Sequence, residues 1–93
     1  MAAGTIPYEA LRERSLQDPE VRAAYDALEP AYQVACLRIE RGLSQKELAE
    51  RVGTKQPTIA RLESGRYAPS LRLLRRVAEA LNARLVIRIE PNN

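Results

Sequence analysis

The stretch SQKELAERVGTKQPTIARLESG, residues 44–65, decides the fold of this chain. Ser44 and Glu47 form an S-x-x-E capping box, which predicts a helix that starts at Ser44. Gly53 supplies the left-handed backbone that a sharp turn requires, and Thr54 is expected to cap a second helix. The stretch therefore predicts two short helices that meet across a tight glycine turn.

The apolar residues of these two helices are spaced so that one helix packs on the other. Leu48, Ala49 and Val52 form the buried stripe of the first helix, and Ile59 and Leu62 point the second helix back onto it. The small Ala49 lies where the two helices cross most closely. This pattern is typical of a helix-turn-helix that reads DNA.

Length and composition narrow the functional classes. The 93 residues suffice for one domain of modest size with a single core. The chain has no histidine and one cysteine, so no catalytic residue, metal site or cofactor is expected, and Cys36 is interpreted as a small buried side chain rather than a reactive thiol. Because no apolar run approaches the ~20 residues of a membrane span and the first residues lack a signal-peptide core, we expect a cytoplasmic protein without a membrane partner.

Charge is distributed unevenly along the chain. Residues 1–36 carry three arginines against six acids, whereas residues 37–93 carry twelve Lys or Arg against six acids. The basic part contains the predicted helix-turn-helix, as expected of a surface that meets phosphates. The acidic part calls for a different partner.

Further helices are expected on both sides of the motif. A short helix is predicted over residues 6–16, and Asp18-Pro19 is a start signal for a helix that runs to about residue 28. Another helix is predicted over residues 31–41. After Ser70, a candidate N-cap, a helix ending near Asn82 would place on one face Leu71, Leu74, Val77, Ala78 and Leu81.

The last residues change period. In RLVIRIE, residues 84–90, Leu85, Ile87 and Ile89 alternate with the residues between them, which predicts a β-strand. Since a lone strand leaves half of its backbone groups unpaired, we expect it to pair with the same strand of a second copy and to hold a homodimer together. A strand added to a different protein, or a disordered tail, is the alternative.

Placed in the major groove, the second helix would bring its N-terminal residues to the base edges. Lys55, Gln56, Pro57 and Thr58 would lie nearest the groove floor, and Arg61 about one turn later. Gln56 can make a bidentate contact to adenine, and Lys55 or Arg61 can bind guanine. Pro57 offers only apolar contact, for instance to a thymine methyl.

Phosphate contacts are expected around the base-reading edge. Gln45 at the start of the first helix and Thr58 are placed to bind phosphates, and Arg66 follows just past the second helix. As a dimer the protein would prefer a palindromic operator in double-stranded DNA.

Residues 44–65 resemble the lambda-repressor-like, Xre-type family. The resemblance covers roughly residues 31–82 and implies a five-helix DNA-binding domain. It also implies that Arg38 and Glu63 form a partly buried ion pair with a structural role. We therefore expect an all-α protein with a helical extension over residues 1–30, a helix-turn-helix domain over residues 31–82, and a strand and tail over residues 83–93.

The run LQDPEVRAAYDALEPAYQVACLRIERGLSQ resembles the antitoxins of the HigA type, in the matching residues Asp18-Pro19-Glu20, Tyr25, Leu28-Glu29-Pro30 and Tyr32. This resemblance implies a small basic ribonuclease toxin of the RelE/ParE-like, HigB-type class as partner, and repression of the operon that encodes both proteins. The acidic surface suits such a cationic partner, and the candidate toxin-binding residues are Tyr8, Leu11, Tyr25 and Leu28.

Two interpretations stay open at this stage. Tyr25 and Leu28 fit a core or dimer contact as well as they fit a toxin contact. The chain is accordingly either an antitoxin that represses its own operon or an Xre-family transcriptional repressor without a toxin partner.

Overall fold

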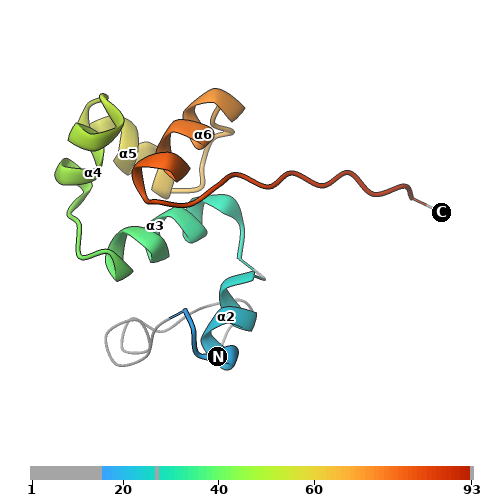
Figure 1. Cartoon of the computed structure of the whole chain (residues 1–93). Coiled ribbons are helices and arrows are strands. Elements are labelled where there is room, and N and C mark those ends of the chain that lie inside the picture. The colour runs from blue at the N-terminus through green and yellow to red at the C-terminus, as the bar shows by residue number, and fades with distance from the viewer. Residues whose placement is uncertain (1–15, 27, 93) are drawn as a thin grey trace.

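The computed structural model describes residues 16–26 and 28–92, and within these residues all regular structure is α-helical (Figure 1). The helices are α2 (Pro19–Asp26), α3 (Pro30–Glu40), α4 (Gln45–Val52), α5 (Gln56–Glu63) and α6 (Leu71–Ala80). Helix α4 packs against α5 and α6, α3 packs against α5, and α2 lies against α3. The predicted all-α fold is confirmed, although residues 31–82 hold four of the described helices rather than five. The helix predicted over residues 6–16 lies outside the described residues, except Leu16, which is in a turn.

The start of α4 follows from its capping box. The Ser44 hydroxyl accepts a hydrogen bond from the Glu47 amide at 3.0 Å, and the Glu47 carboxylate accepts one from the Ser44 amide at 2.8 Å. These two backbone donors would otherwise be unsatisfied at the helix N-terminus. The predicted beginning of this helix is confirmed.

The turn between α4 and α5 uses Gly53 as predicted, but it uses Thr54 differently. Gly53 has a φ of 83°, and the amide of Thr54 donates to the carbonyl of Ala49 at 2.9 Å. Thr54 therefore closes α4 and does not cap α5, which corrects the prediction. The N-cap of α5 is Lys55, and Pro57 lies in the first turn of that helix as predicted.

The core lies where α3, α4, α5 and α6 meet. Leu48, Ile59, Leu62 and Val77 have no exposed surface. Leu71 was predicted to share the buried face of α6, but it is exposed, because it is the first residue of that helix. The buried cluster consists of Val34, Leu43, Leu48, Ala49, Val52, Ile59, Leu62, Leu74, Val77 and Leu81.

Helix α2 is shorter than the sequence indicated. The Asp18 carboxylate accepts a hydrogen bond from the Glu20 amide at 2.9 Å, so the predicted start is confirmed. The helix ends at Asp26 rather than near residue 28. Its one buried residue is Val21.

Two arginines bind backbone carbonyls at the ends of other helices. Arg76 donates to the carbonyl of Val52, the last residue of α4, at 2.6 Å. Arg41 donates to the carbonyl of Leu81, directly after α6, at 3.0 Å. Such carbonyls lack partners within their own helix, so these guanidinium groups connect neighbouring elements.

The C-terminal residues do not form the predicted strand. Residues 83–92 run as an extended chain away from the helices (Figure 1) and do not form a strand. Leu85 packs partly against the core, whereas Ile87 and Ile89 are 54% and 91% exposed. A strand is defined by backbone hydrogen bonds to a neighbouring strand, and none of residues 16–26 and 28–92 forms a strand beside this segment. The prediction of a strand is therefore wrong for the isolated chain.

Candidate nucleic-acid interface

Helix α5 has an exposed leading edge and a buried rear. Lys55, Gln56 and Pro57 are exposed at its N-terminus, Thr58 is half-buried, and Arg61 is exposed about one turn later. The rear of the helix is fixed in the core by the buried side chains described above. This arrangement leaves the predicted base-reading edge free to enter a groove while the helix itself is held rigidly.

Arg61 has a neighbour that restricts its side chain. Its guanidinium carbon lies 5.9 Å from the centre of the Tyr67 ring, which is a cation–π distance. Tyr67 is half-buried and packs against the core, so it offers Arg61 a fixed surface. Arg66, the predicted phosphate ligand, is exposed beside Tyr67.

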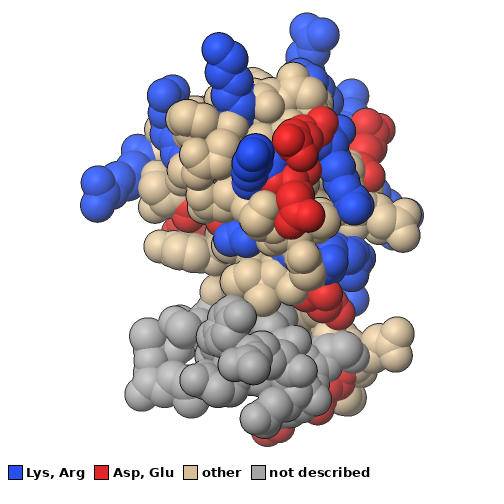
Figure 2. All heavy atoms as spheres, turned by 90° about the vertical axis from the view of Figure 1, so that its left-hand side faces the viewer, with Lys and Arg blue, Asp and Glu red and all other residues tan. Residues whose placement is uncertain are grey.

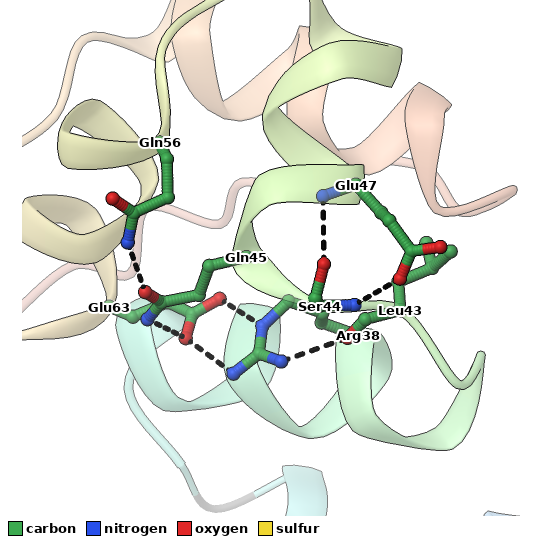
Figure 3. Close-up of polar contacts among 7 residues, drawn as sticks. All are labelled: Arg38, Leu43, Ser44, Gln45, Glu47, Gln56 and Glu63. Atoms are coloured by element: carbon green, nitrogen blue, oxygen red, sulfur yellow. Dashed lines mark hydrogen bonds and ion pairs between the residues drawn. The ribbon is translucent and has the colours of Figure 1, made fainter.

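A continuous chain of polar contacts joins the interior to the leading edge (Figure 3). Gln56 donates from Nε2 to Oε1 of Gln45 at 2.8 Å, and Gln45 donates from Nε2 to Oε1 of Glu63 at 3.1 Å. Glu63 in turn accepts two hydrogen bonds from Arg38, at 2.7 and 2.9 Å. Three helices, α3, α4 and α5, thus meet in one network.

Arg38 and Glu63 form a bidentate ion pair that is largely withdrawn from water. The Arg38 side chain is 16% exposed and that of Glu63 is 6% exposed. Arg38 also donates from Nη1 to the carbonyl of Leu43 at 2.9 Å. Paired and hydrogen-bonded in this way, both charges are tolerated in a compact domain, whereas the loss of one would leave the other unpaired.

Basic side chains are prominent on the side of the molecule that carries α4 and α5. Figure 2 shows this side, where Lys and Arg spread over the upper part and acidic side chains lie among them. The motif region itself contributes Lys46, Arg51, Lys55 and Arg61, all of which are exposed. Such a surface attracts the phosphate backbone of nucleic acid.

Three observations bear on other kinds of site. Cys36 is buried, and burial raises the pKa of its thiol, with the Glu63 carboxylate adding to the effect, so the group is a poor nucleophile. Over residues 16–26 and 28–92, no set of three or more His, Cys, Asp or Glu is placed to hold a metal ion. Nor does this part of the chain contain a helix of the length and apolarity needed to span a membrane.

Tyr25 and Leu85, two of the candidate toxin-binding and dimerisation residues, share a groove. This groove, of about 860 Å³, lies between α2, α3, α6 and the extended tail. Tyr25 is half-buried, and burial raises its pKa, partly offset by Arg22. Leu28 is half-buried outside the lining of this groove. Tyr8 and Leu11 lie outside the described residues.

The link between the two glutamines was not predicted from the sequence. Gln45 and Gln56 were each assigned a separate DNA contact, to phosphate and to base. The sequence feature that could have indicated this contact is the position of the two glutamines, because each is the first residue of its helix. The contact of Arg61 with Tyr67 was missed as well, since it depends on how the loop after α5 folds back.

The capped helix, the glycine turn and the exposed second helix define a helix-turn-helix DNA-binding protein. The sequence profile of the helix-turn-helix family HTH_3 matches residues 37–87, which is more than half of the chain. The chain belongs to this family, which is of the Xre type.

Curated relatives fall into two groups. An uncharacterized HTH-type transcriptional regulator of Methanothermobacter thermautotrophicus is 61% identical over 44 residues, which is 47% of this chain and 64% of the relative. Antitoxin HigA1 of Mycobacterium tuberculosis is 34% identical over 84 residues, which is 86% of this chain and 56% of the relative. In both cases this chain spans less than two thirds of the relative's length. No solved structure matches.

Proposed function

We propose that this transcriptional regulator is the antitoxin of a type II toxin–antitoxin system. In this function it neutralises a small basic ribonuclease toxin of the RelE/ParE-like, HigB-type class and represses its own operon. The observation that carries the proposal is the extent of the similarity to HigA1. The match takes in 86% of the chain, about 80 residues, whereas residues 31–93 number only 63. It therefore includes part of the segment that precedes the helix-turn-helix.

The distribution of charge supports a division of labour between the two parts of the chain. The first 36 residues have three more acids than bases, and the rest has six more bases than acids. A cationic toxin that binds RNA would be attracted to the acidic part and repelled by the basic part. We assign toxin binding to residues 1–30, with Tyr8, Leu11, Tyr25 and Leu28 as contacts.

For DNA, we propose that α5 reads bases through Lys55, Gln56, Pro57, Thr58 and Arg61. Gln45, Thr58 and Arg66 would bind phosphates. A dimer would place two such helices in successive major grooves, so the operator would be an inverted repeat with half-site centres ~34 Å apart. The extended residues 83–92, with the side chains of Leu85, Ile87 and Ile89, would pair with those of a second copy.

The decisive experiments measure toxin neutralisation and operator binding separately in the same set of variants. A tagged full-length chain is expected to co-purify with a small basic protein, identified by mass spectrometry, whose expression alone arrests growth. Leu28→Ala should reduce rescue of growth and leave operator binding unchanged. Gln56→Ala should weaken operator binding and leave the rescue of growth unchanged, because Gln56 belongs to the proposed DNA-binding edge of α5. Rescue that survives deletion of residues 1–30 would contradict the assignment of toxin binding to that segment.

A repressor without a toxin partner is the second candidate. It is favoured by the relatives whose similarity is confined to about half of this chain, such as the regulator of Methanothermobacter thermautotrophicus. In that function residues 1–30 would only stabilise the domain or the dimer. Sequence-specific DNA binding together with the absence of any co-purifying toxin would support this candidate.

Dimerisation can be tested independently of either partner. Deletion of residues 84–93 should convert a dimer into a monomer in light scattering, because it removes the extended segment proposed to pair. A dimer of unchanged mass after the deletion would mean that other surfaces hold the two copies together.

A further inference from the structure

The loop between α5 and α6 is held at both of its ends. Ser64, the C-cap of α5, donates from its hydroxyl to the carbonyl of Arg61 at 2.6 Å and accepts from the amide of Arg66 at 3.3 Å. Gly65 has a φ of 71°, which turns the chain at the end of the helix. At the other end, the side chain of Ser70 caps α6. The backbone between these two points is therefore closely constrained.

Tyr67 lies in the middle of this loop and supplies a ring that contacts α5. Its side chain is half-buried and packs against the core. The guanidinium carbon of Arg61 lies 5.9 Å from the centre of this ring. An exposed arginine otherwise samples many rotamers, and a ring held by the core gives its guanidinium one favoured location. The contact therefore connects a candidate base-reading side chain to the loop that follows its helix.

This contact leaves the hydrogen-bonding capacity of Arg61 unused. A cation–π attraction acts between a charge and the face of a ring, so it consumes none of the five N–H donors of a guanidinium. Among residues 16–26 and 28–92, no carboxylate or carbonyl accepts a hydrogen bond from the Arg61 side chain. Arg38 and Arg76 differ in this respect, because both donate to groups of the fold. Arg61 is thus held in place with its donors free for a ligand.

We propose that Tyr67 is a positioning residue for the recognition of guanine by Arg61. By limiting the rotamers of Arg61, the ring favours a bidentate contact to one guanine over contacts to phosphates, and so raises sequence specificity. This inference rests on the proposed base reading by α5, which it deepens by assigning part of the specificity to a residue outside the helix.

The two kinds of contact differ in the orientation that they require. Guanine is bound through N7 and O6 together, so two N–H groups of the guanidinium must align with the edge of one base. A phosphate accepts a single N–H from many directions and carries no sequence information. Restriction of Arg61 before binding lowers the conformational entropy lost in the more demanding contact. Adenine gains little from this restriction, because it presents a donor at N6 where guanine presents an acceptor.

The test measures the ratio of affinities for two duplexes that differ at one base pair. Preferred sites are first selected by the wild-type protein from a random DNA library, and the guanine read by Arg61 is the one whose selection is relaxed in Arg61→Ala. One duplex carries guanine at this position and the other carries adenine. Tyr67→Leu removes the ring but keeps an apolar side chain against the core. It is expected to lower the guanine-to-adenine ratio about threefold, as for one cation–π contact at an exposed site.

A conservative variant separates the ring from the rest of the side chain. Tyr67→Phe removes the hydroxyl and keeps the ring face, so it should retain the wild-type ratio. The matched control is Arg22→Met, because the guanidinium carbon of Arg22 lies 5.9 Å from the centre of the Tyr25 ring in α2. It breaks an arginine–tyrosine contact of the same distance outside the helix-turn-helix and should also keep the ratio. Circular dichroism establishes that each variant is folded, and Tyr67→Met carries the test if Tyr67→Leu is not.

The outcomes separate this inference from the function on which it rests. If the folded Tyr67→Leu variant keeps or raises the ratio, or if Tyr67→Phe lowers it equally, the ring does not position Arg61, while base reading by α5 stands. A selected site in which Arg61→Ala relaxes no guanine overturns the inference as well. If the wild-type protein selects no sequence over random DNA, the proposed base reading itself fails. A ratio that falls in Tyr67→Leu and is kept in Tyr67→Phe and Arg22→Met supports the inference.

Discussion

The helix-turn-helix over residues 45–63 and the tail over residues 83–92 contrast sharply in how their sequence patterns are realised. Both were predicted from short periodic patterns. In the first region, the groups that form the cap and the turn are hydrogen-bonded within the chain, and the buried stripes pack against other helices of the same chain. In the second, Leu85 packs partly against the core, whereas Ile87 and Ile89 are exposed, and within the described residues no strand pairs with this segment. A local pattern thus specifies a structure when its partners are in the same chain and only a tendency when they are not.

The largest expected effect comes from the packing that the first region has and the second lacks. Ile59→Ala removes a side chain with no exposed surface from the centre of the core. It should lower the free energy of unfolding by about 4 kcal/mol, from lost burial and the cavity left behind. Urea denaturation followed by circular dichroism measures this. A loss below about 1 kcal/mol would mean that the core around α5 is loosely packed.

A somewhat smaller loss is expected from the ion pair that fixes α3 to α5. Arg38→Met leaves the Glu63 carboxylate buried without its cationic partner, which should cost about 3 kcal/mol in the same assay. Arg22→Met is the control, because Arg22 forms an exposed ion pair with Asp26 within α2. Its loss should be under about 0.5 kcal/mol. Equal effects of the two substitutions would show that burial does not distinguish these pairs.

Removal of the N-terminal cap of α4 tests how much the capping box contributes to the free energy of unfolding. Ser44→Ala deletes the acceptor for the Glu47 amide and should cost about 1 kcal/mol. Ser70→Ala removes the equivalent acceptor of α6, where Ser70 accepts from the Leu73 amide at 3.0 Å, and serves as a comparison without a capping box. If Ser44→Ala is neutral, core packing alone determines where α4 begins.

A smaller effect is expected from acid titration of the capping box. Hydrogen bonds from the Ser44 backbone and side chain lower the pKa of Glu47 below its ordinary value. A group with a lowered folded-state pKa stabilises the fold above its unfolded pKa, and this contribution is lost as the pH falls through the folded value. Glu47→Gln should therefore reduce the dependence of stability on pH at acid pH. If the unfolding free energy of the variant changes with acid pH in the same way as that of the wild type, the capping box does not contribute to the pH dependence of stability.

The smallest effect is expected in the tail. Ile89→Ala changes a side chain that is 91% exposed, so the unfolding free energy of the monomer should change by less than about 0.5 kcal/mol. The measurement is repeated at high protein concentration, where a dimer held by this segment would show a larger loss. A large loss that is independent of concentration would indicate that the tail packs on its own domain.

The sequence was most informative about helix ends and the core. Ser44, Gly53 and Ser70 mark backbone positions whose requirements are local, so their roles could be predicted from residue type and spacing. The buried stripe was predictable for the same reason, since the helical period places its residues on one face. Leu71 was the exception, because periodicity does not tell how far the core extends along a helix.

The polar network of the site could not be predicted in the same way. The distance between Gln45 and Gln56 depends on how closely α4 and α5 cross, which is a property of the packed core rather than of either helix. The N-cap of α5 was also predicted one residue too early, at Thr54 rather than Lys55, because the turn after Gly53 takes up Thr54, whose amide donates to the carbonyl of Ala49. Residues whose roles depend on the distance between two elements are thus the ones that sequence patterns miss.

The guanidinium groups that hydrogen-bond to the protein itself also limit how much of its net charge can act on DNA. Of the twelve Lys and Arg in residues 37–93, Arg38, Arg41 and Arg76 are engaged by carboxylate or carbonyl groups of the fold itself. Only cations that neutralise phosphates displace the counterions condensed on DNA, and each such contact steepens the fall of affinity with salt concentration. The salt dependence of binding will accordingly reflect the basic side chains that are not already bound to groups of the protein, and a formal count of charge will overstate it.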